Sequence, residues 1–221
     1  MKSLRDNSLS LVFGLLLLIT LAAQALVGLA DYNEHAQIAG LAQIDLARYV
    51  TSSSFMVDVA ENWQSEYLQF TLYILLTVWL VQRGSSESKP PEDAGFGDDE
   101  QERYGEFAQP DSPAPARAGG WWGGLYSWSL TVVMAVIFLL SWGAQAVTGR
   151  VAFNEERFRD LLDPFTLGEY LQHPDFWNRT LQNWQSELLA VGSMVIFAVF
   201  LRQRGSPESK EVGVPHEETP K

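Results

Sequence analysis

The chain has 221 residues, 47% of them hydrophobic, no cysteine and a formal net charge of −12. The lack of cysteine excludes a disulfide framework, a thiolate nucleophile and any cysteine-ligated metal or iron–sulfur site. An acidic chain with only 15 Lys and Arg residues is not expected to bind nucleic acid. It also contains no phosphate-loop, zinc-protease or nucleophile-elbow motif. We therefore predict no catalytic residue, no cofactor and no metal site.

Uncharged apolar runs along the chain predict membrane-spanning helices, because a helix of about 20 apolar residues crosses a bilayer. The first run resembles a signal peptide, since Lys2 and Arg5 precede it and Ala23-Gln24-Ala25 imitates a cleavage site. The same tripeptide recurs at Ala144, inside the third run, so we interpret the first run as a retained span. The runs are Leu9–Leu29, Tyr67–Val81, Leu125–Gly149 and Leu188–Leu201.

The sequence matches itself without a gap when it is shifted by 121 positions. Roughly a third of the aligned residues are identical, well above what common residue abundances give by chance. Each copy holds two apolar runs, and two crossings return the chain to its starting side. The copies are therefore parallel. The clearest matches are Ala23–Gly28 with Ala144–Gly149, Asn62–Glu66 with Asn183–Glu187, and Gln82–Lys89 with Gln203–Lys210.

These patterns predict an all-α fold, namely an integral membrane four-helix bundle made of two tandem parallel helical-hairpin repeats. Residues 1–89 form the first two-span repeat and residues 121–210 the second. An acidic, disordered linker is expected at 90–120 and a disordered tail at 211–221.

The second helix of each repeat is predicted to begin at a good N-cap, Ser54 or Asp175. Each helix is then expected to run to Arg83 or Arg204, where a following glycine stops it. Within the first outer loop, Gln37–Thr51 has polar positions at helical spacing among apolar residues, namely Gln37, Gly40, Asp45, Arg48 and Thr51. This pattern predicts an amphipathic helix that lies on the membrane or over the bundle.

The basic residues that flank the spans predict the orientation of the chain. Eight of them lie on the side of the termini and five on the other, which places both termini in the cytoplasm. The segment Gly84–Arg117 carries nine acidic residues against three basic ones. A cytoplasmic protein partner that binds through residues 84–118 is one interpretation of this segment, and a solvated tether is the other.

Polar side chains near the outer ends of the spans form the one candidate site. At similar depth on antiparallel helices, a glutamine amide can donate to a carboxylate. Paired carboxylates there could share a proton or hold a cation, or the whole cluster could serve only helix packing. Trp63 and Trp184 are predicted interfacial anchors. The cluster consists of Gln24, Asn62, Glu66, Gln145, Asn183 and Glu187.

The doubled Asn-Trp-Gln-Ser-Glu, the doubled Gln-Arg-Gly-Ser-x-Glu-Ser and the Ala-Gln-Ala spans resemble an uncharacterised bacterial family of four-span membrane proteins, a domain of unknown function. The resemblance implies a bacterial inner (cytoplasmic) membrane location and no known activity. We expect a non-enzymatic structural or partner-binding module in the lipid bilayer. The alternative is a small transporter or an ion- or proton-binding protein that uses Glu66 and Glu187. Homodimerisation stays open.

Overall fold

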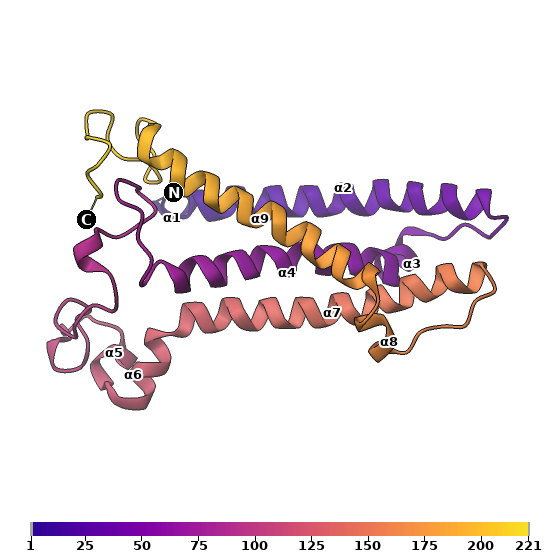
Figure 1. The fold of residues 1–221 in the computed structure, drawn as a ribbon, viewed down its shortest axis with the longest axis horizontal. Coiled ribbons are helices and arrows are strands. Elements are labelled where there is room, and N and C mark those ends of the chain that lie inside the picture. Colours follow the sequence, from indigo (N-terminus) through magenta and orange to yellow (C-terminus); the bar gives the residue numbers. More distant parts are fainter. Residues whose placement is uncertain (1, 221) are drawn as a thin grey trace. The chain divides into compact units, whose positions relative to one another are not determined.

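The computed structural model describes residues 2–220, and within that range it contains helices and no strand (Figure 1). The predicted all-α class is therefore confirmed. The longer helices are α2 (Ser8–Ile38), α4 (Ser53–Leu76), α7 (Ser129–Arg159) and α9 (Pro174–Phe200). The shorter elements are α1 (Lys2–Asp6), α3 (Leu46–Val50), η1 (Pro91–Asp93), η2 (Gly105–Phe107), α5 (Ala114–Ala118), α6 (Gly120–Ser127) and α8 (Leu167–Leu171).

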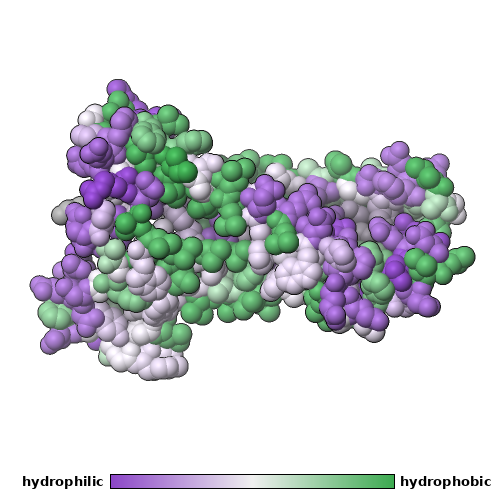
Figure 2. All heavy atoms as spheres, viewed as in Figure 1, coloured by the Kyte–Doolittle hydropathy of each residue, from purple (hydrophilic) through white to green (hydrophobic). Residues whose placement is uncertain are grey.

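Three helices, α2, α7 and α9, are long and apolar enough to cross a membrane. At 1.5 Å per residue, a 31-residue helix such as α2 or α7 is about 46 Å long, which exceeds the ~30 Å hydrocarbon layer. Their apolar side chains are largely exposed, for example Leu18 and Leu140, and hydrophobic residues cover much of the helical surface in Figure 2. Such a surface is stable in lipid but not in water.

The helix α4 is not among the helices of the described chain that are long and apolar enough to cross a membrane. It ends at Leu76, and α9 ends at Phe200, so the predicted helix ends at Arg83 and Arg204 are wrong. Thr77, Val78 and Trp79 follow α4, and β-branched and aromatic residues extend a helix poorly. The chain beyond them forms hydrogen bonds of its own, described below, that replace the helical ones.

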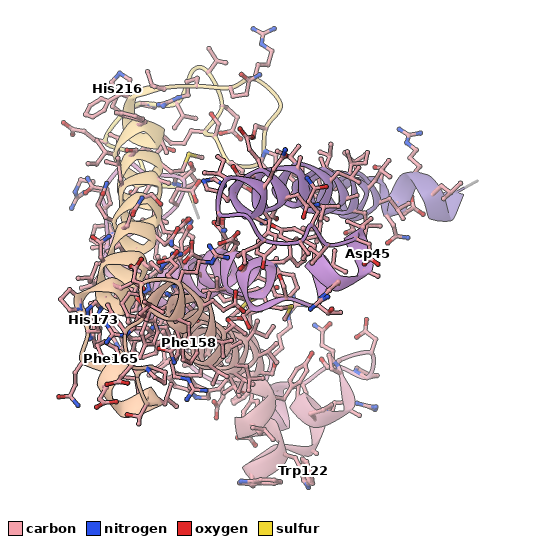
Figure 3. All side chains as sticks on the ribbon, turned by 90° about the vertical axis from the view of Figure 1, so that its right-hand side faces the viewer. Asp45, Trp122, Phe158, Phe165, His173 and His216 are labelled. Carbon is pink, nitrogen blue, oxygen red and sulfur yellow. The ribbon has the colours of Figure 1, made fainter. Side chains whose placement is uncertain are left out.

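The starts of the second helices also differ from prediction. The Ser52 hydroxyl, not that of Ser54, accepts the Phe55 amide, and His173 Nδ1 accepts the Asp175 amide. The amphipathic helix predicted at Gln37–Thr51 is wrong as well, since α2 continues to Ile38 and only α3 is helical after the turn. Asp45 caps α3 by accepting the Arg48 amide at 2.8 Å (Figure 3).

The chain divides into two compact units whose boundaries fall inside α4, α7 and α8. The first unit combines the chain up to Ala60 with Ala144–Tyr170, and the second combines Glu61–Gly143 with Leu171 onward. Each unit thus contains parts of both predicted repeats. The predicted division at residues 89, 120 and 210 stays a prediction.

In the first unit, an asparagine near the end of each long helix holds the following loop. The Asn33 amide donates to the Ile44 carbonyl at 2.9 Å and accepts the Ile44 amide at 2.8 Å. Asn154 makes the same two bonds to Phe165, at 2.9 and 2.8 Å. In each case one asparagine side chain satisfies both the backbone N–H and the backbone C=O of a single loop residue. This pair of bonds holds the loop against the helix that precedes it.

Farther along each of the two loop regions, a tyrosine ring packs on a glycine of the preceding long helix. Tyr49 lies against Gly28, where its hydroxyl would overlap a Cβ atom, and it belongs to a buried cluster with Ala25 and Phe55. Tyr170 lies against Gly149, where its hydroxyl would be 2.7 Å from a Cβ atom. A glycine is thus required at each position because only a bare backbone lets the ring approach.

In the second unit, aromatic rings join α7 to α9. The Trp142 ring lies 5.7 Å from Phe138, 6.1 Å from Phe176 and 5.8 Å from Trp184. The Trp142 indole also donates to the Thr180 hydroxyl at 3.4 Å. Such ring pairs add packing energy beyond the area they bury.

The linker between the predicted repeats contains short helical elements, η1, η2 and α5, before α6 begins. Its first part is held on the end of α4, where the Gly95 amide donates to the Val78 carbonyl at 2.6 Å. The disorder expected for residues 90–120 and 211–221 stays a prediction.

We predict that Gly28→Ala and Gly149→Ala each destabilise the protein by about 1–3 kcal/mol, because the new methyl group overlaps a packed tyrosine. Thermal unfolding of detergent-solubilised protein measures this. Gly14→Ala and Gly143→Ala are matched controls, since no atom lies within 4 Å of either added methyl group. Adding Tyr49→Phe to Gly28→Ala should recover part of the loss. Equal melting temperatures for Gly28→Ala and Gly14→Ala would contradict this packing.

Candidate functional site

The structure exposes some of the predicted site residues and buries others. Gln24 is exposed, whereas Gln145 is fully buried, and both belong to the first compact unit. In the second unit, Asn62 and Glu66 are exposed, and Asn183 and Glu187 are half-buried. Glu66 and Glu187 lie close enough for their charges to interact. The Asn183 side chain donates to the Arg179 carbonyl at 3.0 Å.

In this unit α4 buries Gln64, which was not among the predicted site residues, together with its neighbour Ser65. Gln64 is 0% exposed, and its carbonyl oxygen accepts a 2.7 Å hydrogen bond from the Trp184 indole. Trp184 is therefore half-buried in a helix contact, whereas Trp63 is 43% exposed. The role of both as interfacial anchors stays a prediction. The repeated Asn-Trp-Gln-Ser-Glu contains Gln64, so the signal was present in the sequence.

An ion pair also links α4 to α9, on the N-terminal side of the Gln64–Trp184 bond. Arg179 on α9 lies 3.3 Å from the Glu61 carboxylate on α4 and 3.4 Å from the Asp175 carboxylate. The Glu61 side chain is only 18% exposed, so water screens this pair less than a surface pair. A polar cavity of 330 Å³ lies beside it. Two polar pairs, Gln64 with Trp184 and Glu61 with Arg179, thus link α4 to α9.

The repeated segments Gln82–Lys89 and Gln203–Lys210, here called the two serine turns, fold in the same way. The backbone N–H of Gln82 donates to the Ser88 hydroxyl at 2.8 Å, and the backbone N–H of Gln203 donates to the Ser209 hydroxyl at 2.9 Å. A glycine with positive φ follows each arginine, at 85° for Gly84 and 82° for Gly205. In each turn a serine side chain thus satisfies a backbone amide that lies beyond the end of the helix.

A lysine closes each serine turn onto the chain that follows. Lys89 donates to the Gly95 carbonyl at 2.9 Å. Lys210 is 2% exposed and donates to the carbonyls of Pro215, His216 and Glu218 at 2.9–3.0 Å. Burial lowers the pKa of the Lys210 ammonium group from its ordinary value.

The two serine turns contact each other within the second unit. The Ser86 hydroxyl donates to the Glu208 carbonyl at 2.9 Å, and the Gly84 amide donates to the Thr219 hydroxyl at 2.7 Å. His216 Nδ1 lies 3.1 Å from the Val199 carbonyl near the end of α9 (Figure 3). The turns and the tail thus form one polar assembly at the ends of α4 and α9.

Two cavities meet at this assembly. A polar cavity of 1180 Å³ is lined by both serine turns and by η1, and an apolar cavity of 260 Å³ lies between the second half of α4 and α9. Tyr73, Thr77, Glu87 and Ser88 line both. The Tyr73 hydroxyl donates to the Glu87 carboxylate at 2.5 Å where the cavities join. The sequence alone predicted only a tether or a docking segment here, because the bond between Tyr73 and Glu87 joins residues 14 positions apart across the end of α4.

We predict that Lys210→Met opens the tail, because it removes the donor of three backbone carbonyls, each costing about 1–3 kcal/mol when buried and unpaired. Hydrogen exchange at the amides of residues 211–219 should become at least about tenfold faster. Lys89→Met is the matched control and should leave this segment unchanged, since Lys89 donates to Gly95 instead. Unchanged exchange in Lys210→Met would show that the lysine does not hold the tail.

A family model described as Domain of unknown function (DUF6766) matches residues 1–221, the whole chain. No curated protein and no solved structure matches it. The helices, the serine turns and the cavities are therefore features of a chain that belongs to the DUF6766 family, a domain of unknown function with helices apolar enough to cross a membrane.

Proposed function

We propose that this protein is a four-span membrane protein of the bacterial inner membrane with both termini in the cytoplasm, and that it is a non-enzymatic module that binds a cytoplasmic partner. Two tandem parallel copies of a helical hairpin account for the 121-residue spacing of identical residues. The helix α4 serves as the fourth span because it occupies the position in its copy that α9 occupies in the other.

The observation that carries the proposal is the pairing of the two serine turns at the ends of α4 and α9. Both turns form the same hydrogen bonds and contact each other through Ser86 and Glu208. In the proposed topology this assembly lies at the cytoplasmic face, beside an acidic linker. A fixed polar surface with a negatively charged neighbour suits a partner that carries a basic surface.

A non-enzymatic role is supported by the polar side chains that link α4 to α9, because these groups contact each other. Gln64 pairs with Trp184, and Glu61 pairs with Arg179, so these groups hold helices together. In the described chain, no group of three or more His, Cys, Asp or Glu side chains could hold a metal ion. A basic partner would bind through residues 84–118. A second copy of this chain is the alternative occupant, and the crosslinking test below distinguishes the two.

A second candidate function is ion or proton binding by Glu66 and Glu187. The observation that favours it is that Glu187 is half-buried within range of the Glu66 charge. Like charges at such a distance are relieved by a shared proton or a bound cation.

Single-cysteine variants can test the proposed topology by chemical labelling. The chain contains no native cysteine, so there is no background labelling. Asp45→Cys and Asp163→Cys should react with a membrane-impermeant maleimide in intact spheroplasts. Gln101→Cys and Glu217→Cys should react only after permeabilisation, because the proposed topology places them in the cytoplasm. Labelling of Gln101→Cys on the same side as Asp45→Cys would contradict four spans.

The same variants test the partner. A benzophenone attached to the cysteine of Gln101→Cys should crosslink one basic cytoplasmic protein in membranes, and the matched probe on Asp45→Cys should not. Neutralising Asp98, Asp99 and Glu100 to amides should abolish the crosslink. A crosslinked dimer of this chain would replace the partner by a second copy, and equal crosslinking from both positions would contradict the proposed module.

For the second candidate, we predict that Glu66→Gln with Glu187→Gln removes any stabilisation by cations, because both charges are lost. Thermal unfolding with and without Na⁺, K⁺ or Mg²⁺ measures this, and Gln182→Glu is a control that keeps both carboxylates. A melting temperature that does not depend on the cation in the unaltered protein rules out ion binding at this pair. Stability that falls in the double variant independently of cations assigns the pair to packing.

A further inference from the structure

The two cavities at the end of α4 differ in chemistry, although they share part of their lining. The apolar cavity is bounded by leucine and valine side chains of α4, α9 and the turn after α4. They include Leu72, Leu76, Leu80, Leu188, Val191 and Val195. Its volume of 260 Å³ is near the lower end of the range for small-molecule sites, and suits a single hydrocarbon chain better than a bulky ring system.

The polar cavity carries an excess of negative charge. Five acidic and two basic side chains line it, and both lysines, Lys89 and Lys210, already donate to backbone carbonyls. The carboxylates therefore face the space without a cation committed to them. The acidic side chains are Glu87, Glu92, Asp93, Glu102 and Glu211.

Glu87 stands where the two cavities join. One of its carboxylate oxygens accepts the Tyr73 hydroxyl, and the other is buried with no hydrogen-bond partner among the described residues. A buried carboxylate oxygen is costly to leave unpaired, and a positive group beside it removes that cost. The unpaired oxygen therefore marks the place where a cationic group would be most favourable.

We propose that these cavities form one binding site for a single-chain cationic amphiphile. The hydrocarbon tail lies between α4 and α9, and the ammonium head lies beside Glu87 with η1 opposite it. Charge complementarity selects this ligand over a phospholipid, because the phosphate of a phospholipid would face five acidic side chains. The site goes beyond the proposed partner-binding role, and it needs no partner protein.

The test uses the full chain in nanodiscs of phosphatidylcholine, with a dodecyltrimethylammonium analogue that carries a diazirine in its tail. After irradiation, peptide mapping should find adducts in residues 69–82 and 188–195, and unlabelled dodecyltrimethylammonium should compete. Dodecyl sulfate and dodecyl maltoside have the same tail with an anionic or a neutral head, and neither should compete at the same concentration.

Variants at the two ends of the site separate the head from the tail. Glu87→Gln should weaken competition at least about tenfold, and Glu92→Gln with Asp93→Asn, on the exposed η1, should weaken it without touching the helices. Glu100→Gln is the matched control because it removes a charge of the same linker outside the cavity. Val191→Trp should block the tail, and Val136→Trp on the exposed surface of α7 should not.

The outcomes are distinct. Adducts spread over α2 and α7, or equal competition by dodecyl sulfate, would overturn the site, as would unchanged competition in both head variants. Loss of the partner crosslink at position 101 with normal amphiphile labelling would contradict the proposed partner-binding role alone. Amphiphile labelling that is absent while the crosslink persists would contradict this inference alone.

Discussion

The double hydrogen bond from an asparagine side chain to one loop residue is the constraint on which the first unit depends. The bond fixes how the chain turns after α2 and after α7, because Asn33 and Asn154 each satisfy both backbone groups of their partner. Once the loop has turned back, Tyr49 and Tyr170 reach the helix and pack on a glycine. The asparagine hydrogen bonds and the close tyrosine–glycine contact thus add to a hydrophobic cluster around Ala25, Tyr49 and Phe55 that is small for a domain of this size.

The second unit is held by a different set of contacts. Its helices meet through indole rings and through two polar pairs, the buried Gln64 with Trp184 and the partly buried Glu61 with Arg179, while many of their aliphatic side chains are exposed. This arrangement is expected in lipid, where apolar side chains gain little by meeting each other and hydrogen bonds between helices determine the pairing. The serine turns extend the same principle beyond the helix ends, with side chains satisfying the backbone.

The proposed functions concern different parts of the molecule and can be tested separately. The partner-binding role depends on the linker, the ion-binding candidate on Glu66 and Glu187, and the amphiphile site on the junction at Glu87. Sequence reasoning predicted the first two from charge and from helical periodicity. The amphiphile site was not predictable from the sequence. Tyr73 and Glu87 can meet only because α4 ends at Leu76 and does not continue to Arg83 as predicted.

The sequence by itself determined the all-α class, the helices α2, α7 and α9 and the residues that recur 121 positions apart, because apolar length and identity are local properties. Only the tertiary structure decided which polar residues turn inward. Gln64 is buried and Glu66 is exposed although they are neighbours on α4, and Gln145 is buried where its counterpart Gln24 is exposed. Identical sequence in two copies does not fix burial, because burial depends on which helix each copy meets, and that partner is chosen by contacts distant in the chain.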